Sequence, residues 1–164
     1  MTPFQKVKHK IGDWNTTQSK IQKWQKEGLT VVFTNGCFDI VHYGHIHYLA
    51  ASKAEGHKLV VAMNAESSIR KLKGATRPIH DTISRLHIMA SFEFVDAVVE
   101  FSEETPLELL QTLRPNVLVK GGDYIPENIV GYDLIKSLGG EVKVLPFVEG
   151  YSTSKLEEKM KKGS

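Results

Sequence analysis

Two histidines follow a glycine-containing turn directly after a short apolar run, and these residues are the best suited to chemistry. The turn contains Gly36, and His42 and His45 stand where we expect the first turn of a helix. Glycine lets a phosphate approach the backbone closely, and free N–H groups at a helix start attract anions. Residues three apart share a helix face, and Gly44 removes a side chain that would block it. The segment therefore predicts a phosphate site with two imidazoles facing it.

On residue types alone, other interpretations of this turn stay open. Histidines at this spacing can bind a metal, although no third ligand stands close by in the sequence, or they can be ordinary surface residues. The turn lacks the Gly-Lys-Ser/Thr of a P-loop, and its glycine spacing does not fit a dinucleotide fingerprint. Cys37 can act through its backbone N–H or its thiol, or be a small packed side chain. As the single cysteine, it excludes an intramolecular disulfide and a four-cysteine zinc site.

The elements that must position this turn alternate between short apolar runs and amphipathic stretches. Near-continuous apolar runs separated by helical stretches are typical of a parallel sheet covered on both faces. We therefore predict an α/β fold with a Rossmann-like, doubly wound, five-stranded parallel sheet. In such sheets ligands bind at the carboxyl ends of the strands, near the switch in strand order. The expected strands cover residues 30–34, 58–63, 95–99, 116–120 and 141–145.

Helical spacing and cap signals place helices between these strands. Thr105 can cap a helix that has Pro106 at its first position and ends before Pro115. Hydroxyl residues begin the last helix and lysines end it, which suits the helix dipole. A loop after the second strand is expected to carry Lys71 and Lys73. The expected helices cover residues 16–27, 44–54, 82–92, 105–114, 132–138 and 152–162.

Length and composition fit one ordinary globular domain. The 164 residues carry 21 Lys and Arg against 19 Asp and Glu, a net charge of +2, which gives no broad footprint for nucleic acid. No apolar run is long enough to span a membrane, and residues 1–11 lack the apolar core of a secretory signal. We expect a cytoplasmic protein with neither membrane nor nucleic-acid partners. Residues 1–28 are predicted to form an N-terminal extension with one helix, before a domain at 29–164.

Two motifs resemble those of the nucleotidyltransferase superfamily. Residues 36–39, Gly-Cys-Phe-Asp, followed by 42–45, His-Tyr-Gly-His, are similar to its Gly-x-Phe-Asp and His-x-Gly-His signature. Residues 149–154 resemble its second motif at a helix start. In many bacteria the most similar domain is fused behind a sugar kinase, and at this length we expect its standalone form. Over roughly residues 18–160, the stretches 33–39, 70–78 and 119–124 narrow the resemblance to the D-glycero-β-D-manno-heptose 1-phosphate adenylyltransferases.

The resemblance implies direct nucleotidyl transfer between two small-molecule substrates. An oxygen of the heptose 1-phosphate attacks the α-phosphate of ATP in line, giving ADP-heptose and pyrophosphate without a covalent enzyme intermediate. Mg²⁺ is expected with ATP, with Asp39 as a candidate ligand, and a homo-oligomer, dimer or larger, is expected. The alternative is a cytidylyltransferase acting on glycerol 3-phosphate or a similar alcohol phosphate. It fits less well because residues 146–149 lack the arginine that those enzymes carry. A nucleotide-binding module without catalysis is a further alternative.

The resemblance also implies a role for each residue in these motifs. Charge stabilisation at the reacting phosphate is assigned to His42, His45 and Lys73. Nucleotide binding is assigned to Thr34, Asn35, Gly36, Cys37, Phe38, Gly44, Lys120, Gly121, Asp123, Tyr151, Ser152 and Thr153. Sugar-phosphate binding is assigned to Asp39, Lys71, Arg77 and Arg85. Plainer roles stay open, namely solvated lysines, ordinary helix capping by the hydroxyl residues, and a structural or dimer-contact role for the arginine at 85.

Overall fold

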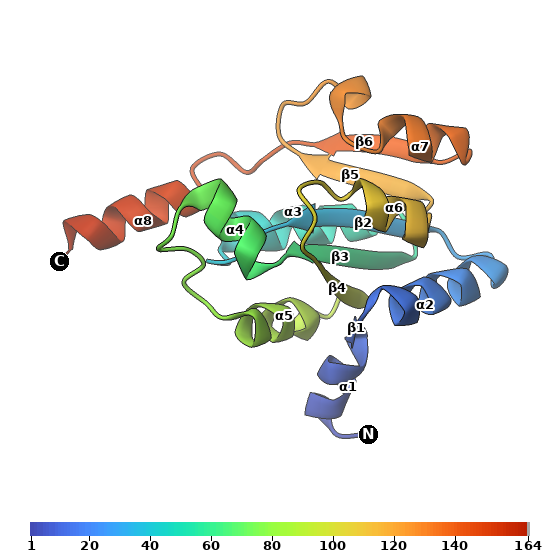
Figure 1. The fold of residues 1–164 in the computed structure, drawn as a ribbon, viewed down its shortest axis with the longest axis horizontal. Helices are drawn as coiled ribbons and strands as arrows, with labels where there is room; N and C mark the ends of the chain where they lie inside the picture. Colours follow the sequence, from blue (N-terminus) through green and yellow to red (C-terminus); the bar gives the residue numbers. More distant parts are fainter. Residues whose placement is uncertain (164) are drawn as a thin grey trace.

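All strands of the central sheet run parallel, in the order β1-β4-β3-β2-β5-β6 (Figure 1). The computed structural model describes residues 1–163, so Ser164, the last residue of the expected domain, lies outside the described residues. Within residues 1–163 the sheet has six strands, one more than predicted, and the doubly wound α/β fold is confirmed. The strands are β1 (Ile11–Gly12), β2 (Val31–Gly36), β3 (Lys58–Asn64), β4 (Ala97–Phe101), β5 (Val117–Gly121) and β6 (Glu141–Leu145).

The strand order reverses beside β2. From β2 the chain moves outward through β3 and β4, and it then returns to the other side of β2 to form β5 and β6. Val32 of β2 lies opposite Leu59 of β3 on one side and Val117 of β5 on the other. The carboxyl ends of β2 and β5 therefore flank the switch point, which is where ligands bind in sheets of this kind.

The additional strand comes from the N-terminal extension and corrects the predicted strand number. β1 pairs with Val98 and Val99 of β4 at the edge of the sheet. The Trp14 side chain fixes this edge, because its Nε1–H donates to the carbonyl oxygen of Glu100 at 2.9 Å. Two residues are too few to show the apolar pattern that marks a strand, so the sequence carries no signal for β1.

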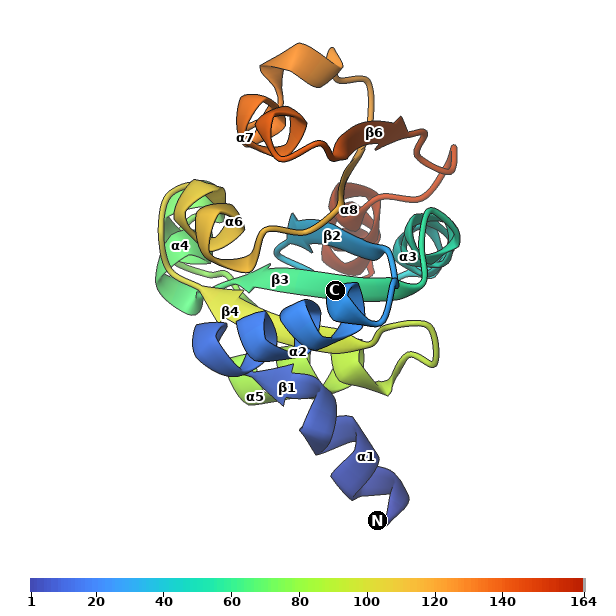
Figure 2. The same cartoon turned by 90° about the vertical axis from the view of Figure 1, so that its right-hand side faces the viewer.

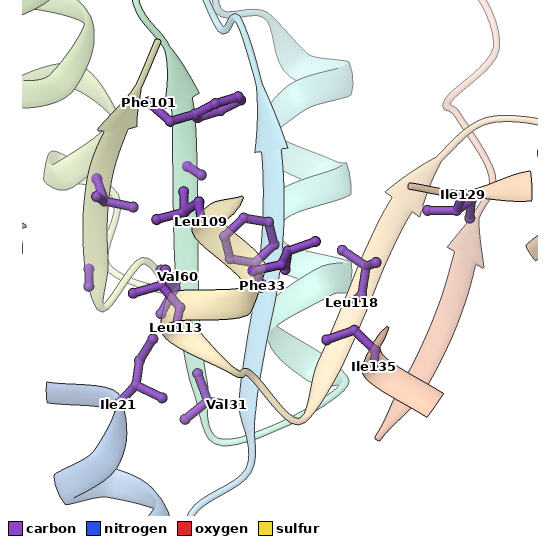
Figure 3. Close-up of a cluster of buried hydrophobic side chains, with 14 residues drawn as sticks. Ile21, Val31, Phe33, Val60, Phe101, Leu109, Leu113, Leu118, Ile129 and Ile135 are labelled. Atoms are coloured by element: carbon purple, nitrogen blue, oxygen red, sulfur yellow. The ribbon is translucent and has the colours of Figure 1, made fainter. Parts of the chain in front are cut away.

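One face of the sheet packs against the longer helix of the N-terminal extension. Ile21 is fully buried there in a cluster with strand residues that include Phe33 (Figure 3). Trp14 and Trp24 pack against the same cluster, so the apolar residues of the extension cover the flank of their own domain. The helices of this face are α2 (Trp14–Lys26), α6 (Leu107–Leu113) and α7 (Tyr132–Ser137).

The opposite face of the sheet is covered by a helix that follows directly from the histidine motif. This helix, α3, has His42 as its cap and buries Leu49 against the strands. A second helix, α5, buries Met89 in the same cluster. Figure 2 shows α3 and α6 on opposite sides of the sheet. The bounds of the two helices, α3 (Tyr43–Ala54) and α5 (Thr82–Ser91), lie within one residue of the prediction.

Two other helices bear on the site. α4 (Glu66–Lys73) replaces the expected loop, and Lys71 and Lys73 lie in its last turn. Its cap, Ala65, makes no side-chain hydrogen bond, so the sequence carries no cap signal for this helix. α8 (Thr153–Lys162) begins as predicted, but none of its ten described residues is buried, and it projects from the body of the molecule (Figure 1).

The remaining helical segments are α1 (Pro3–Lys10), which contacts α5, and the short helix η1 (Pro126–Asn128). The start of α6 differs from the prediction by one residue. Pro106 is the cap, and Thr105 precedes it. Thr105 Oγ1 lies 3.5 Å from the backbone nitrogen of Leu107, at the outer limit of a hydrogen bond, so the threonine caps the helix only weakly. No helix in residues 1–163 has the length and apolar character needed to cross a membrane.

Candidate active site

Two glycines shape the turn between β2 and α3. A Cβ at Gly36 would lie 2.9 Å from the ring of Phe38, which is buried and has a φ of 44°. A Cβ at Gly44 would lie 3.0 Å from Cε1 of His42 and 3.1 Å from Cβ of Tyr151. Gly36 therefore makes room for the ring that closes the turn, and Gly44 makes room for the imidazole and the tyrosine opposite it.

His42 and His45 form a stacked pair at the start of α3, with ring centroids 3.9 Å apart. Nδ1 of His42 accepts the N–H of Gly44 at 3.1 Å, and Nδ1 of His45 accepts the N–H of His42 at 3.3 Å. A neutral imidazole whose Nδ1 accepts a hydrogen bond carries its proton on Nε2. Each ring therefore keeps an Nε2–H donor for a ligand.

Burial keeps both imidazoles neutral near pH 7. It lowers the pKa of His42, and the pKa of His45 falls from 6.5 to about 4. For His45 the largest cause is burial, followed by the charges of His42 and Lys73. Two protonated rings at this separation would repel each other strongly. The pair can thus donate two hydrogen bonds to an anion without holding two like charges in contact.

Two adjoining cavities lie in front of these imidazoles. The side cavity, of about 200 Å³, lies between the start of α3 and the segment that joins β6 to α8. The central cavity, of about 400 Å³, lies across the carboxyl ends of β2 and β5. His45, Tyr48, Phe147 and Thr153 line both, so the cavities form one recess at the switch point. The side cavity is further lined by His42, Gly44, Val148, Tyr151 and Ser152, and the central cavity by Asn35, Gly36, Cys37, Phe38, Asp39, Lys73, Lys120, Gly121 and Tyr124.

Two lysines reach the central cavity from different elements. Lys73 comes from the last turn of α4, and Lys120 comes from the end of β5. Burial lowers the pKa of Lys120, so its ammonium group is poorly solvated and gains much from an anionic partner. The structure thus gathers these two lysines and the two imidazoles around one recess.

The start of α8 supplies further anion-binding groups to the recess. Ser152 is the cap, and its Oγ accepts the N–H of Lys155 at 3.2 Å. Thr153 is the first helical residue and lines both cavities. Tyr151 is half exposed, with its ring 5.0 Å from that of Tyr43. Helix capping by Ser152 and phosphate binding by the free N–H groups of the first turn are compatible.

Asp39 and Arg77 form a buried ion pair at the edge of the recess, where Asp39 lines the central cavity and Arg77 lines a neighbouring cavity beside α8, and sugar-phosphate binding by the two residues stays a prediction. The Asp39 carboxylate accepts hydrogen bonds from Arg77 Nε at 2.7 Å, Ile79 N at 2.8 Å and His80 N at 2.9 Å. Burial opposes ionisation of Asp39, but these bonds outweigh it and hold its pKa below the usual value. Arg77 also forms an ion pair with Glu157 of α8. Both side chains therefore join the 74–80 loop to the turn and to α8, while Nη2 of Arg77 is buried without a hydrogen-bond partner among the described residues.

These contacts bear on Asp39 as a candidate magnesium ligand, a role that stays a prediction. Its Oδ1 is occupied by His80 and its Oδ2 by Arg77 and Ile79. Mg²⁺ is usually held by one or two carboxylates together with substrate phosphates, and Oδ1 of Asp39 accepts only one hydrogen bond. Across residues 1–163 there is no group of three or more His, Cys, Asp or Glu side chains that could hold a metal ion.

Two predicted ligands, Arg85 and Thr34, lie beneath the recess rather than on its wall. Arg85 is 1% exposed and donates to the carbonyl oxygens of Cys37 at 2.5 Å and Asn64 at 2.7 Å. These contacts favour the structural alternative for Arg85, which lines neither cavity, and sugar-phosphate binding by this side chain stays a prediction. Thr34 is fully buried, with its hydroxyl 2.7 Å from the phenol oxygen of Tyr48.

Other predicted residues lie outside the two cavities, while some that line them were not predicted. Within the described residues, Lys71 and Asp123 are exposed and line neither cavity. Tyr48 lines both and lies one helical turn beyond His45, a spacing that could have indicated it. Phe147 and Tyr124 also line the recess, and the only signal for them is an aromatic residue shortly after a strand end.

Comparison with known families and proteins agrees with this geometry. The family model described as cytidylyltransferase-like matches residues 33–159. "Bifunctional protein HldE" of Geotalea uraniireducens is 46% identical over 155 residues, which are 94% of this chain and 32% of that protein. The protein of the same name from Coxiella burnetii is 52% identical over 133 residues, which are 81% of this chain and 28% of that protein. The chain thus spans about a third or less of these relatives.

Solved structures with the same fold include one that is matched over its whole length. The crystal structure of the lipopolysaccharide core biosynthesis protein from Thermoplasma volcanium is 32% identical, with a TM-score of 0.60, and the match covers 76% of this chain and all of that one. Pantoate-beta-alanine ligase from Francisella tularensis is 17% identical with a TM-score of 0.58, over 92% of this chain and 76% of that one. The second likeness concerns the fold alone.

Proposed function

The chain belongs to the cytidylyltransferase-like family, and we propose that it is a nucleotidyltransferase that joins AMP from ATP to D-glycero-β-D-manno-heptose 1-phosphate, giving ADP-heptose and pyrophosphate. The resemblance of residues 33–39, 70–78 and 119–124 to the heptose 1-phosphate adenylyltransferases supports this choice of substrates. The sequence identity to two proteins named HldE, 46% over 155 residues and 52% over 133 residues, agrees with it.

One observation carries the proposed chemistry. The stacked imidazoles of His42 and His45 present Nε2–H donors at the same recess as Lys73, Lys120 and the start of α8. Phosphoryl transfer needs positioning and charge stabilisation rather than an activated protein nucleophile. This recess offers donors and cations, and the thiol of Cys37 is not required.

The proposed reaction is a single displacement. A phosphate oxygen of the sugar 1-phosphate attacks the α-phosphorus of ATP and forms the new P–O bond. The bond from that phosphorus to the bridging oxygen of the β-phosphate breaks, and pyrophosphate leaves with the electron pair. The attacking phosphate is already anionic, so no general base is needed. The imidazole N–H groups and Lys73 stabilise the charge on the equatorial oxygens, and the helix start of α8 holds the outer phosphates.

Three expectations remain part of the proposal. Mg²⁺ enters as the ion that accompanies ATP, with Asp39, whose Oδ1 accepts a single hydrogen bond, as its candidate protein ligand. We place the enzyme in the cytoplasm, where ATP is available. We also propose a homo-oligomer of two or more chains.

A matrix of nucleotides against phosphorylated acceptors tests the function. Purified protein is given ATP or CTP with heptose 1-phosphate or glycerol 3-phosphate, and pyrophosphate release is followed. We expect turnover with ATP and heptose 1-phosphate. Preference for CTP and glycerol 3-phosphate would establish the alternative transferase, and no turnover by correctly folded protein would overturn the proposal.

His42→Ala tests the role of the imidazole pair. Loss of one preorganised donor costs about 100- to 1000-fold in kcat. ATP binding, measured by calorimetry, should weaken much less, because the other donors remain. His47→Ala is the matched control, since His47 is exposed on the same helix and lines neither cavity. Unchanged kcat in His42→Ala would show that the imidazole pair does not stabilise the reacting phosphate, whereas a module that binds nucleotide without catalysis would show no turnover in either protein.

A further inference from the structure

A third cavity, here called the outer cavity, lies between the 74–80 loop and α8. Its volume is about 820 Å³, within the range of about 300–1,000 Å³ typical of small-molecule sites. In Figure 1 the segment between α4 and α5 runs beside α8, and the cavity is lined from both. The residues used below are Lys73, Thr76, Ile79, Thr153, Glu157 and Lys161.

The outer cavity adjoins the central cavity at two residues. Lys73 and Thr153 line both. A molecule in the outer cavity would therefore meet a phosphate in the central cavity beside these two side chains. In-line displacement requires the attacking oxygen and the leaving oxygen on opposite sides of the phosphorus. With the outer phosphates of the nucleotide in the recess beside α3, the open side of the reacting phosphate is the outer cavity.

The walls of the outer cavity suit a phosphorylated polyol. Lys73 and Lys161 supply two ammonium groups, and neither is in an ion pair among the described residues. Thr76 and Thr153 supply hydroxyl groups, and the half-buried Glu157 carboxylate is held in place by Arg77.

The remaining wall is apolar in part, with Ile40 and Met160 beside Ile79, and it also includes Arg77 and His80. Ile79 lines the outer cavity with a side chain that is 62% exposed, and it offers a surface for the C–H face of a sugar ring. Cations for a phosphate, hydroxyls for a polyol and an apolar platform therefore converge in one cavity.

We propose that the outer cavity is the acceptor subsite, which binds the sugar 1-phosphate, and that Lys161 of α8 is a specificity-determining residue of this subsite. The inference rests on the proposed function for the identity of the acceptor. It assigns to α8 two tasks at opposite ends: its first turn faces the nucleotide, and its third turn faces the acceptor. Lys161 contacts the acceptor and leaves the nucleotide untouched.

Lys161→Ala is the direct test, with Lys159→Ala as the matched control on the same helix. Lys159 has the same charge but does not line the cavity. We expect Lys161→Ala to raise the KM for the sugar 1-phosphate about tenfold, which corresponds to ~1.4 kcal/mol, and to leave the KM for ATP within about twofold. Lys159→Ala should leave both unchanged. Equal effects of the two variants, or a shift in the KM for ATP alone, would overturn the proposal.

A steric variant gives a second readout. Thr76 is exposed and lines the outer cavity but not the recess, so Thr76→Trp should narrow the outer cavity and raise the KM for the sugar phosphate while ATP affinity is kept. Circular dichroism shows whether each variant is folded. An acceptor KM equal to that of the unmodified protein would contradict the assignment.

Binding without turnover separates this proposal from the proposed function. The protein is saturated with an ATP analogue that has a methylene group between the α- and β-phosphates, and heptose 1-phosphate is titrated by calorimetry. Binding that weakens in Lys161→Ala but not in Lys159→Ala supports the subsite even if no pyrophosphate is released. Absence of binding, or equal binding to both variants, overturns it. Failure of turnover with intact binding counts against the proposed function alone.

Discussion

At the scale of single residues, the His42–His45 pair owes its chemistry to two backbone hydrogen bonds. Each Nδ1 accepts an N–H of the helix start, which leaves each Nε2–H for a ligand. The same two residue types at the same spacing could have formed a metal site or an exposed pair. The backbone contacts and the burial decide between these possibilities, and neither is visible in the spacing of the two histidines.

The depressed pKa of His45 predicts how stability depends on pH. Its folded value of about 4 lies below the value near 6.5 expected when the chain is unfolded. Between these values the unfolded chain binds more protons, so the stabilising contribution is present above pH 6.5 and is lost as pH falls toward 4. From pH 7 to pH 5 this loss is at most about 2 kcal/mol, and less where water screens the ring.

Urea unfolding at pH 7 and pH 5 measures this loss, and pH 5 stays above the range in which Asp39 titrates. His45→Asn keeps an acceptor but removes the titration, so its free energy of unfolding should fall less between the two pH values. His47→Asn, changed at an exposed position of the same helix, should behave as the unmodified protein. An identical fall in all three proteins would show that His45 is not desolvated in the folded state.

Residue type alone does not decide the role of an arginine. Arg77 and Arg85 have the guanidinium groups expected of phosphate ligands, yet one is paired with two carboxylates and the other with two backbone carbonyls. Their buried charges are satisfied by partners far away in the sequence, with Asp39 and Glu157 on either side of Arg77. A sequence cannot distinguish an arginine that binds substrate from one that holds the loops around it, because both need a partner that only the fold supplies.

At the scale of elements, the long apolar runs of the sequence predicted the strands and therefore where the turns of the site lie. β6 covers the predicted residues, and each of the other four predicted strands has at least one end that differs from the prediction by one or two residues. The turns after β2 and β5 meet at the switch point. The sequence did not indicate β1, which is too short for a pattern, or α4, which is polar and has no side-chain cap. Both depend on tertiary contacts rather than on local signals. Placing Lys73 at the end of a helix fixes its position more firmly than the expected loop would.

Of the elements that build the site, α8 is the least firmly attached to the rest of the molecule. None of its ten described residues is buried, and the ion pair between Arg77 and Glu157 ties its second turn to the loop opposite. Arg77 is 7% exposed and held by Asp39, so removing the Glu157 charge leaves a buried cation with one partner fewer.

Glu157→Gln should therefore loosen α8. We expect amide hydrogen exchange in α8 to quicken about tenfold, corresponding to ~1.4 kcal/mol of local opening, and the KM values of both substrates to rise together. Glu158→Gln is the matched control, because Glu158 pairs with Lys162 on the exposed side of the same helix at 2.9 Å. Similar exchange rates in the two variants would show that α8 is held by other contacts.

At the scale of the whole molecule, the N-terminal extension is part of the sheet and of the core. It adds β1 to the edge strand β4, and its helix α2 buries Ile21 on the face opposite α3. The site lies at the carboxyl ends of β2 and β5, so the extension can affect the reaction only through the stability of the body that carries the site. Stability and catalysis should separate when the extension is changed.

Ile21→Ala tests this separation. Removing a fully buried aliphatic side chain costs about 2–5 kcal/mol, because the transfer free energy is lost and a cavity is left. Urea unfolding should show that loss for the whole cooperative transition, while kcat and both KM values, measured well below the transition, stay within about twofold. Gln22→Ala, at an exposed neighbouring position of the same helix, should cost less than about 0.5 kcal/mol. If Ile21→Ala instead left the main transition unchanged, or produced a separate early one, residues 1–28 would be an independent appendage, and the catalytic body would begin at the strand that carries the first motif.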